Sequence, residues 1–187
     1  MSEATTVSSA GDLQQIIQLQ RMNLIHHVDE ITLKSQGFVT VQHTIEVLQQ
    51  MHNLAPSIII KEDNKVVAYA LVMLNECRRL VSTLEPMFAL FDKLIYNGKP
   101  LNEYRFYVMG QICIAKDFRG QGLFEMLYNK HRDIYQSQFD FIITEVSVRN
   151  QRSLRAHERV GFETLHTYKD ELDEWAVIIW NWKNPHR

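Results

Sequence analysis

The sequence predicts an α/β protein in which one mixed β-sheet carries helices on its faces. Two observations support this prediction. Helix-type and strand-type hydrophobic patterns alternate along the whole chain, and an apolar strand, a glycine-bearing loop and an amphipathic helix follow one another directly past mid-chain. The expected order is strand, two helices, two strands, a helix, then strand, helix, strand, helix and two final strands.

The first half of the chain is expected to hold a short strand, two helices and a hairpin. After the β-prone residues 5–7, apolar residues recur at helical spacing from Asp12, the expected N-cap, to Ile25. A second helix is expected from its cap, Thr44. The apolar runs 58–60 and 66–74 flank the polar residues 62–65, a pattern typical of a β-hairpin.

The second half predicts three further helices and four strands. The helices are expected at Pro86–Ile95, ended by Asn97-Gly98, at Gly122–Tyr135, and at Asn150–Val160, ended by Gly161. The strands are expected at Arg105–Ala115, Phe139–Val148, Phe162–Tyr168 and Glu174–Trp182.

Composition excludes several classes of protein. The 187 residues are 45% hydrophobic, which is enough for a core, and they fit one domain. A net charge of −2 gives no general reason to bind nucleic acid or a membrane surface. The apolar runs are too short to cross a bilayer, and the N-terminus lacks a secretory pattern. With only Cys77 and Cys113, disulfide scaffolds and four-cysteine zinc sites are excluded, and we expect a soluble, cytoplasmic protein.

Three further features are assigned no chemistry. His26-His27 lacks metal-ligand spacing and is expected to be a solvated or half-buried pair. Cys113 lies within an expected strand and is interpreted as a small buried residue rather than a nucleophile. The tryptophans at 175, 180 and 182 are expected to pack a terminal strand.

The informative stretch is the loop between the strand that ends near Ile114 and the helix that starts at Gly122. Such a loop presents backbone N–H groups at a helix N-terminus, which favours a phosphate or pyrophosphate. Glycine allows a phosphate to approach the backbone closely, and Arg119 adds positive charge beside the loop. A tight turn without a ligand is the alternative. The nucleotide P-loop pattern is absent, and no full Gly-x-Gly-x-x-Gly follows the first strand.

Two motifs together resemble a known family. Arg119-Gly-Gln-Gly-Leu-Phe124 is similar to the Arg/Gln-x-x-Gly-x-Gly/Ala signature of the GNAT (GCN5-related) N-acyltransferase superfamily. About thirty residues on, residues 145–162 resemble its second signature: a strand, Asn150-x-x-Ser153, a helix and Gly161-Phe162. The resemblance covers nearly the whole chain. It implies one twisted, mostly antiparallel sheet of about six or seven strands in a single domain.

The resemblance also implies acetyl-CoA as co-substrate, without a metal. The implied site for the pyrophosphate is the loop Arg119, Gly120, Gln121, Gly122, Leu123 and Phe124, acting through backbone amides. The strand Ile112, Cys113 and Ile114 would line the pantetheine, and Asn150 and Ser153 would contact the cofactor. The sheet would splay between that strand and residues 141–148.

Two residues are implied to be catalytic. His157 occupies the position of a tyrosine that is a frequent general acid in the family, so it is either an acid or a packing residue. Glu145 matches a family base and is expected among apolar neighbours; the alternative is a structural ion pair with Arg149 or Arg152. A further departure is Phe124 at a small-residue position, where the side chain is expected to turn into the core.

A third departure is an insertion at about residues 75–101. Its apolar helix is expected to cover the acceptor side of the slot or to form a homodimer contact. The resemblance predicts acetyl transfer to a primary amine of a small molecule or peptide. The alternatives are a non-catalytic CoA-binding or sensor module, an acyltransferase for a larger acyl-CoA, and an interaction domain. Polyamine, aminoglycoside, amino acid and protein N-terminus all stay open as acceptors.

Overall fold

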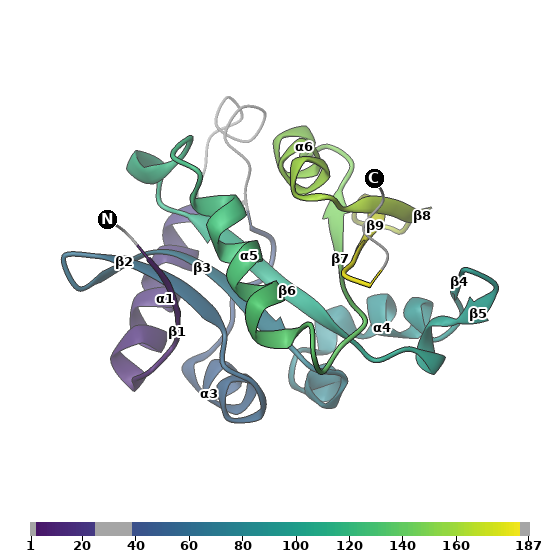
Figure 1. The fold of residues 1–187 in the computed structure, drawn as a ribbon, viewed down its shortest axis with the longest axis horizontal. Helices are drawn as coiled ribbons and strands as arrows, with labels where there is room; N and C mark the ends of the chain where they lie inside the picture. Colours follow the sequence, from purple (N-terminus) through teal and green to yellow (C-terminus); the bar gives the residue numbers. More distant parts are fainter. Residues whose placement is uncertain (1–2, 25–38, 184–187) are drawn as a thin grey trace.

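The computed structural model describes residues 3–24 and 39–183 (Figure 1). A seven-stranded sheet in the order β1-β2-β3-β6-β7-β9-β8 dominates the described chain, and β6–β7 is its one parallel pair. The strands are β1 (Ala4–Thr6), β2 (Ile58–Glu62), β3 (Lys65–Met73), β6 (Phe106–Ile114), β7 (Phe141–Ser147), β8 (Glu163–Lys169) and β9 (Glu174–Asn181). The prediction of a mixed, mostly antiparallel sheet is confirmed.

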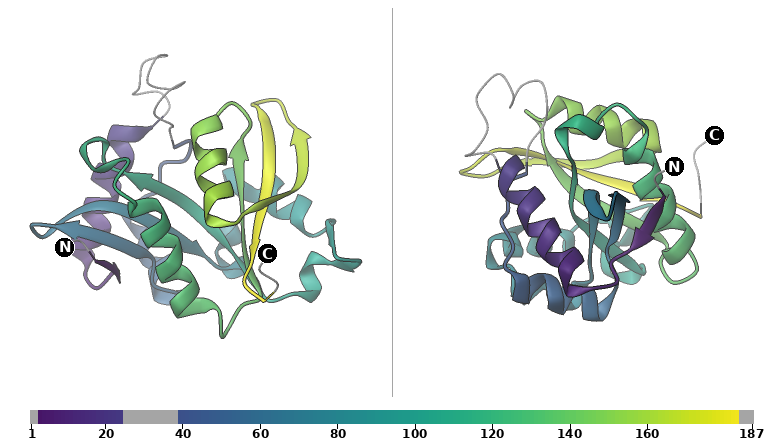
Figure 2. Two further views of the ribbon diagram at one scale, coloured as in Figure 1. Left: turned by 45° about the horizontal axis from the view of Figure 1, so that its top comes forward. Right: turned by 90° about the vertical axis from the view of Figure 1, so that its left-hand side faces the viewer.

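Helices cover both faces of this sheet (Figures 1 and 2). On one face, α1 (Ala10–Asn23) and α3 (Ile45–Leu54) pack on a core that includes Ile16, Leu48 and Tyr69. On the other face, α5 (Leu123–Tyr135) and α6 (Gln151–Val160) pack on a second core that includes Leu127 and Ile142. Alternate residues of the strands therefore belong to different cores, as the pleat requires.

The hairpin expected from residues 62–65 is present between β2 and β3. Asp63 and Asn64 take left-handed backbone angles, with φ of 48° and 63°. Positive φ at both turn residues is the geometry of a two-residue hairpin whose twist matches the flanking strands.

The N-terminus of α1 differs from the prediction, because Ser9 and not Asp12 is the N-cap. The Ser9 hydroxyl accepts a hydrogen bond from the Asp12 amide at 3.2 Å. Asp12 lies in the first turn, where its buried carboxylate forms a 2.7 Å ion pair with Lys61 of β2. The expected helix end at Ile25 and the pair His26-His27 lie outside the described residues.

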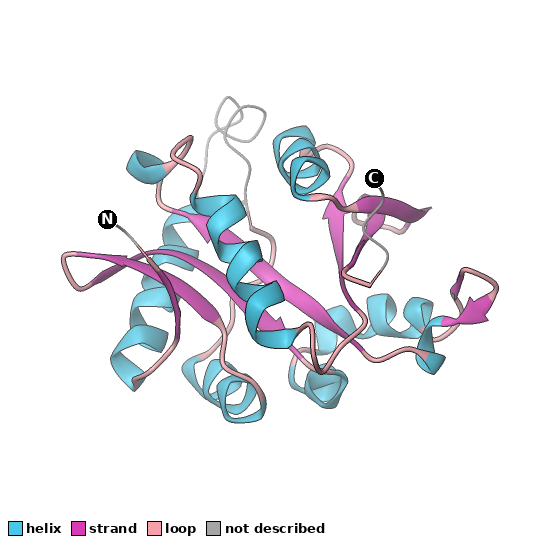
Figure 3. Cartoon of the chain, in the orientation of Figure 1, coloured by secondary structure: helices cyan, strands magenta, loops and turns pink. Residues whose placement is uncertain are grey.

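The insertion also differs from the prediction. Its helix α4 spans Glu85–Phe91 and does not reach Ile95, which lies in a small hairpin of β4 (Ile95–Tyr96) and β5 (Lys99–Pro100) (Figure 3). Asn97-Gly98 is the two-residue turn of this hairpin, with φ of 46° and 78°, rather than a helix end. Asn-Gly between strands is a strong hairpin signal, and the apolar spacing from Leu90 to Ile95 concealed it.

The parallel strands β6 and β7 are paired over only part of their length. Its ladder runs from Phe106/Phe141 to Val108/Ile143 and then stops, although both strands continue. One residue further on, the Thr144 hydroxyl donates to the Met109 carbonyl at 2.8 Å in place of a backbone bond. Beyond that point the two strands separate, as the prediction of a splayed sheet requires (Figure 1).

Candidate active site

A cavity of about 380 Å³ lies beside the end of β6 and the start of α5. Ten of the eleven residues predicted to bind a cofactor line it: Ile112, Cys113, Ile114, Arg119, Gly120, Gly122, Leu123, Phe124, Asn150 and Ser153. The exception is Gln121, whose exposed side chain donates to the Asp117 carbonyl. Tertiary structure therefore brings together two sequence motifs about thirty residues apart.

The loop before α5 owes its shape to two glycines. Gly120 and Gly122 have φ of 76° and 79°, and Gly122 is the N-cap of α5. Left-handed angles strain residues that carry a Cβ. A Cβ added at either glycine would meet nothing within 4 Å, so space beside the backbone is open. The loop can thus admit an anion close to the backbone at the N-terminus of α5.

Arg119 does more than supply charge to this loop. Its Nε donates to the Ile114 carbonyl at 3.0 Å, and one terminal nitrogen donates to Asn23 Oδ1 of α1 at 2.6 Å. Half-burial lowers the pKa of Arg119, and the charge of nearby Arg152 lowers it further. Arg119 thus fastens the loop to β6 and α1, while Arg152 and Arg159 add positive charge to the cavity lining.

The second motif forms the start of α6. Asn150 is the N-cap, and its side-chain oxygen accepts from the Ser153 amide at 3.2 Å. This local bond explains the spacing of the two residues, because an N-cap side chain commonly bonds the amide three residues on. Both side chains lie where the first cavity meets a second one.

The second cavity, of about 410 Å³, lies on the far side of Asn150 and Ser153. Its walls come from β6, β7, the β8–β9 hairpin and the insertion, and they include Met87, Gln111, Glu145, Tyr168 and Trp175. Thr83, Leu84, Pro86 and Met87 line it, as expected if the insertion covers the acceptor side. The prediction located this segment in sequence but gave its helix the wrong end.

Glu145 of β7 is an unusual group in this second cavity. Burial raises the pKa of its carboxyl to about 7, although a 2.6 Å hydrogen bond from the Tyr168 hydroxyl to Oε2 opposes the rise. The ion pair considered with Arg149 does not form, because Arg149 pairs with Asp173 at 2.7 Å. A half-buried carboxyl that titrates near neutrality suits proton transfer.

His157 is 1% exposed and its ring nitrogens are both engaged within the protein. Its Nδ1 is 2.8 Å from the Ser153 carbonyl, which can only accept, so Nδ1 carries the hydrogen. Its Nε2 lies 2.7 Å from the hydroxyl of Tyr128 of α5. Burial lowers the pKa of His157 to about 4. This geometry favours the packing interpretation over the acid, since the ring stays neutral and presents no free N–H.

Phe124 and Cys113 behave as the sequence suggested. The Phe124 ring packs edge-on against His157 with centroids 5.0 Å apart, so it turns toward the aromatic core while still lining the first cavity. Burial raises the pKa of the Cys113 thiol to about 12, which disfavours the thiolate that a nucleophile needs. Cys77 and Cys113 are both free thiols.

Neither a metal-type cluster of side chains nor a membrane-spanning helix occurs among the described residues. Within residues 3–24 and 39–183, no group of three or more His, Cys, Asp or Glu side chains is arranged to hold a metal ion. Over the same residues, no helix is both long enough and apolar enough to pass through a membrane.

Several residues that line the two cavities were not predicted from the sequence. The β8–β9 hairpin contributes Tyr168, Asp170 and Trp175 to the second cavity. They line it because β9 and β8 lie next to β7 in the sheet. Asn23 comes from α1, nearly a hundred residues before the glycine loop in sequence. Only Arg152 and Arg159 carried a local signal, because they recur with Ala156 on one face of an expected helix.

The site thus combines a glycine loop at the N-terminus of α5, two parallel strands that separate, and a second cavity that contains Glu145. The sequence matches the acetyltransferase (GNAT) family over residues 25–162, and the chain belongs to that family. Membership implies transfer of an acyl group from acyl-CoA to an amine. No curated protein matches the chain.

Solved structures agree on the fold. The ribosomal-protein-S18-alanine N-acetyltransferase of Escherichia coli matches with TM-score 0.63 and 10% identity, over 97% of this chain and 94% of that one. A spermidine N-acetyltransferase SpeG chimera from Vibrio cholerae and hSSAT matches with TM-score 0.61 and 14% identity, over 100% and 99%. The NatC complex bound to Gag peptide and CoA matches with TM-score 0.64 and 12% identity, over 96% and 98%.

Proposed function

We propose that this protein is an acetyl-CoA-dependent N-acetyltransferase that transfers an acetyl group directly to a primary amine, with Glu145 as the general base. One observation carries the proposal. Burial raises the pKa of the Glu145 carboxyl to about 7, and this carboxyl lines the second cavity, which adjoins the first cavity beside the glycine loop. An alkylammonium ion must lose a proton before it can attack, and a base with a pKa near neutrality removes it efficiently.

The first cavity fits an acyl-CoA. The open space beside Gly120 and Gly122 and the N-terminus of α5 suit the phosphates, and Arg152 and Arg159 line the same cavity. The apolar side chains of Ile112, Ile114 and Ala156 suit the pantetheine arm. When bound, acetyl-CoA supplies an activated thioester carbonyl.

The residues of the second cavity would prepare the amine. Glu145 accepts the proton from the ammonium group, so that the amine lone pair becomes available. Leu84 and Met87 from the insertion, with Met109 of β6, give the wall an apolar part that limits water around this carboxyl. Burial is the main cause of the raised pKa of Glu145, and this wall would contribute to it.

We assign His157 a structural part in this scheme. Its neutral ring bridges Ser153 of α6 and Tyr128 of α5, and it packs edge-on with the Phe124 ring. This contact would keep the start of α6 aligned with the glycine loop. The Ser153 hydroxyl, 3.3 Å from His157 Nδ1, is one of two polar side chains, with that of Asn150, at the junction of the two cavities.

The acceptor stays within the classes left open by the sequence, which are polyamine, aminoglycoside, amino acid and protein N-terminus. The names of two matched structures, an S18-alanine N-acetyltransferase and a spermidine N-acetyltransferase, support including both a peptide and a polyamine in the search. The cytoplasmic location and the homodimer also stay predictions. Light scattering of the purified chain tests the homodimer.

The deciding experiment is an acetylation screen across those four amine classes, with release of free CoA as the readout. Turnover that is lost in Glu145→Gln supports the proposal. Glu163→Gln is the matched control, because Glu163 also accepts from a tyrosine hydroxyl, that of Tyr96 at 3.2 Å, but does not line either cavity.

The same screen separates the rival functions. CoA binding by calorimetry without turnover of any amine would favour the non-catalytic sensor, a reading to which the buried, neutral His157 lends some weight. Turnover with a longer acyl-CoA in place of acetyl-CoA would favour the broader acyltransferase. Absence of CoA binding would favour an interaction domain and refute the proposal.

A further inference from the structure

Tyr168 forms a hydrogen bond with Glu145, the proposed base, across an intervening strand of the sheet. Glu145 lies on β7 and Tyr168 on β8, and β9 runs between these two strands. Glu145 faces Val177 of β9, while Tyr168 faces Trp175 two residues away. The tyrosine ring therefore spans β9 diagonally, over the same face as Glu145, to bring its hydroxyl within 2.6 Å of Oε2. Only a long side chain can bridge non-adjacent strands in this way.

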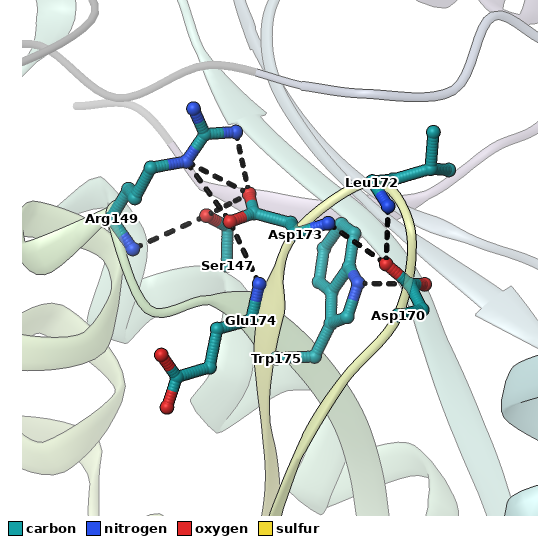
Figure 4. A network of polar contacts seen from close by, with 7 residues as sticks. All are labelled: Ser147, Arg149, Asp170, Leu172, Asp173, Glu174 and Trp175. Atoms are coloured by element: carbon teal, nitrogen blue, oxygen red, sulfur yellow. Dashed lines mark hydrogen bonds and ion pairs between the residues drawn. The ribbon is translucent and has the colours of Figure 1, made fainter.

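The hairpin that carries Tyr168 is fastened to the end of β7 (Figure 4). Asp173 accepts from the Ser147 hydroxyl at 2.6 Å and from two nitrogens of the Arg149 guanidinium, and both partners follow Glu145 closely in sequence. Asp170 accepts from the Leu172 and Asp173 amides and from the Trp175 indole. The turn that follows Tyr168 is thus held by hydrogen bonds within itself and to the end of β7.

The charges that face Glu145 do not otherwise favour its ionised form. Asp170, at the same cavity, raises the pKa of Glu145. His157 is neutral, and Arg149 is engaged by Asp173. Among the described residues, the Tyr168 hydroxyl is the hydrogen-bond partner of the carboxylate, and it acts against burial.

This bond also distinguishes the two oxygens of Glu145. Oε2 is taken by the Tyr168 hydroxyl, whereas Oε1 has no hydrogen bond to any described residue. Because Glu145 lines the second cavity, Oε1 is the oxygen available to a ligand there. Of the roughly four lone-pair sites of a carboxylate, the Tyr168 hydroxyl occupies one on Oε2, and both sites on Oε1 stay open for a proton.

We propose that Tyr168 is a positioning residue, whose hydroxyl holds Oε2 of Glu145 and leaves Oε1 to accept the proton of the acceptor amine. This role rests on the proposed function. The N–H bond of the ammonium breaks, an O–H bond forms at Oε1, and the proton then passes to solvent. Tyr168 keeps its own proton throughout, because burial and the adjacent carboxylate hold its pKa far above the ordinary tyrosine value.

The test is the variant Tyr168→Phe, measured in two ways. Removing a bond to the charged form raises the pKa of Glu145, so the acidic limb of kcat/KM is expected to move about one pH unit upward. NMR titration of ¹³C-labelled glutamate, with the Glu145 signal assigned through Glu145→Gln, is expected to show the same upward shift without any substrate. A purely structural role for Tyr168 would lower activity equally at every pH.

Tyr96→Phe is the matched control, because it removes a tyrosine–glutamate bond, to Glu163, away from both cavities. It is expected to leave the Glu145 signal and the pH profile unchanged. An unmoved Glu145 titration in Tyr168→Phe overturns the inference. A moved titration with an unmoved kcat/KM limb also overturns it, since Glu145 would then not be the base. If the unsubstituted protein acylates no amine, the proposed function fails as a whole, and the NMR shift alone tells whether the contact exists.

Discussion

Replacing His157 with glutamine should make the stability of this protein less sensitive to mild acid. The neutral ring of His157 is enclosed between Ser153 and Tyr128 and has a pKa of about 4, against 6.5 for a free histidine. Between these two values the unfolded chain binds a proton that the folded chain refuses. Stability is therefore fully present above pH 6.5 and is lost as the pH falls toward 4.

The magnitude follows from those two values. Lowering the pH from 7 to 5.5 is expected to remove about 1.2 kcal/mol of unfolding free energy through His157 alone. His43 and His131, whose pKa values burial also lowers, contribute to the acid loss in both proteins. Glu145, with its raised pKa, opposes the loss in both. These contributions cancel when the variant is compared with the unsubstituted chain at each pH.

At pH 7 the variant His157→Gln is expected to be less stable by about 1–3 kcal/mol, because the Tyr128 hydroxyl loses its ring acceptor. That deficit should shrink by about 1.2 kcal/mol at pH 5.5. Urea unfolding followed by tryptophan fluorescence at both pH values measures it. The control variant His166→Gln, at a half-exposed position on β8, should show the same change of unfolding free energy with pH as the unsubstituted chain. An equal deficit at both pH values for His157→Gln would refute a buried, neutral His157.

The other predictions concern the site itself. Glu145→Gln should lower kcat/KM by about 10²- to 10⁴-fold, the usual contribution of a general base, while the Kd for acetyl-CoA stays unchanged in calorimetry. Gly122→Ala should cost about 1–2 kcal/mol of stability through its left-handed φ of 79° and should also weaken acetyl-CoA binding. Gly98→Ala, at φ of 78° in the β4–β5 turn, should carry the same strain without the binding loss, and equal Kd values for the two variants would contradict a phosphate role for the loop. Tyr168→Phe should move the acidic limb of kcat/KM upward, as described above.

Local signals in the sequence were sufficient wherever the cause of a structure lies within a few residues. The Asn150–Ser153 spacing marks an N-cap because its hydrogen bond closes within one helical turn. The glycines before α5 mark a loop because only their backbone tolerates its angles. Where two local signals competed, the prediction was wrong. Apolar spacing extended the predicted helix to Ile95, into the β4–β5 hairpin, and Asp12 was predicted as the N-cap in place of Ser9.

Partners of the chemically important side chains lie far away in the sequence. His157 meets Tyr128 of the preceding helix, Arg119 meets Asn23 of α1, and Glu145 meets Tyr168 across an intervening strand. A periodic pattern in the sequence does not predict these contacts, because they depend on the order of strands in the sheet and on the packing of helices against it.

By itself, the sequence determined the α/β class and the elements that carry the two motifs, and ten of the eleven residues that it predicted to bind a cofactor line the first cavity. These follow from short-range rules of backbone geometry, capping and hydrophobic period. Tertiary structure alone decided that β6 and β7 part after Val108 and Ile143, that His157 is buried and neutral, and that Glu145 titrates near pH 7 beside Tyr168. The physical reason is that burial and charge at a side chain are set by everything packed around it, and most of those neighbours come from distant parts of the chain.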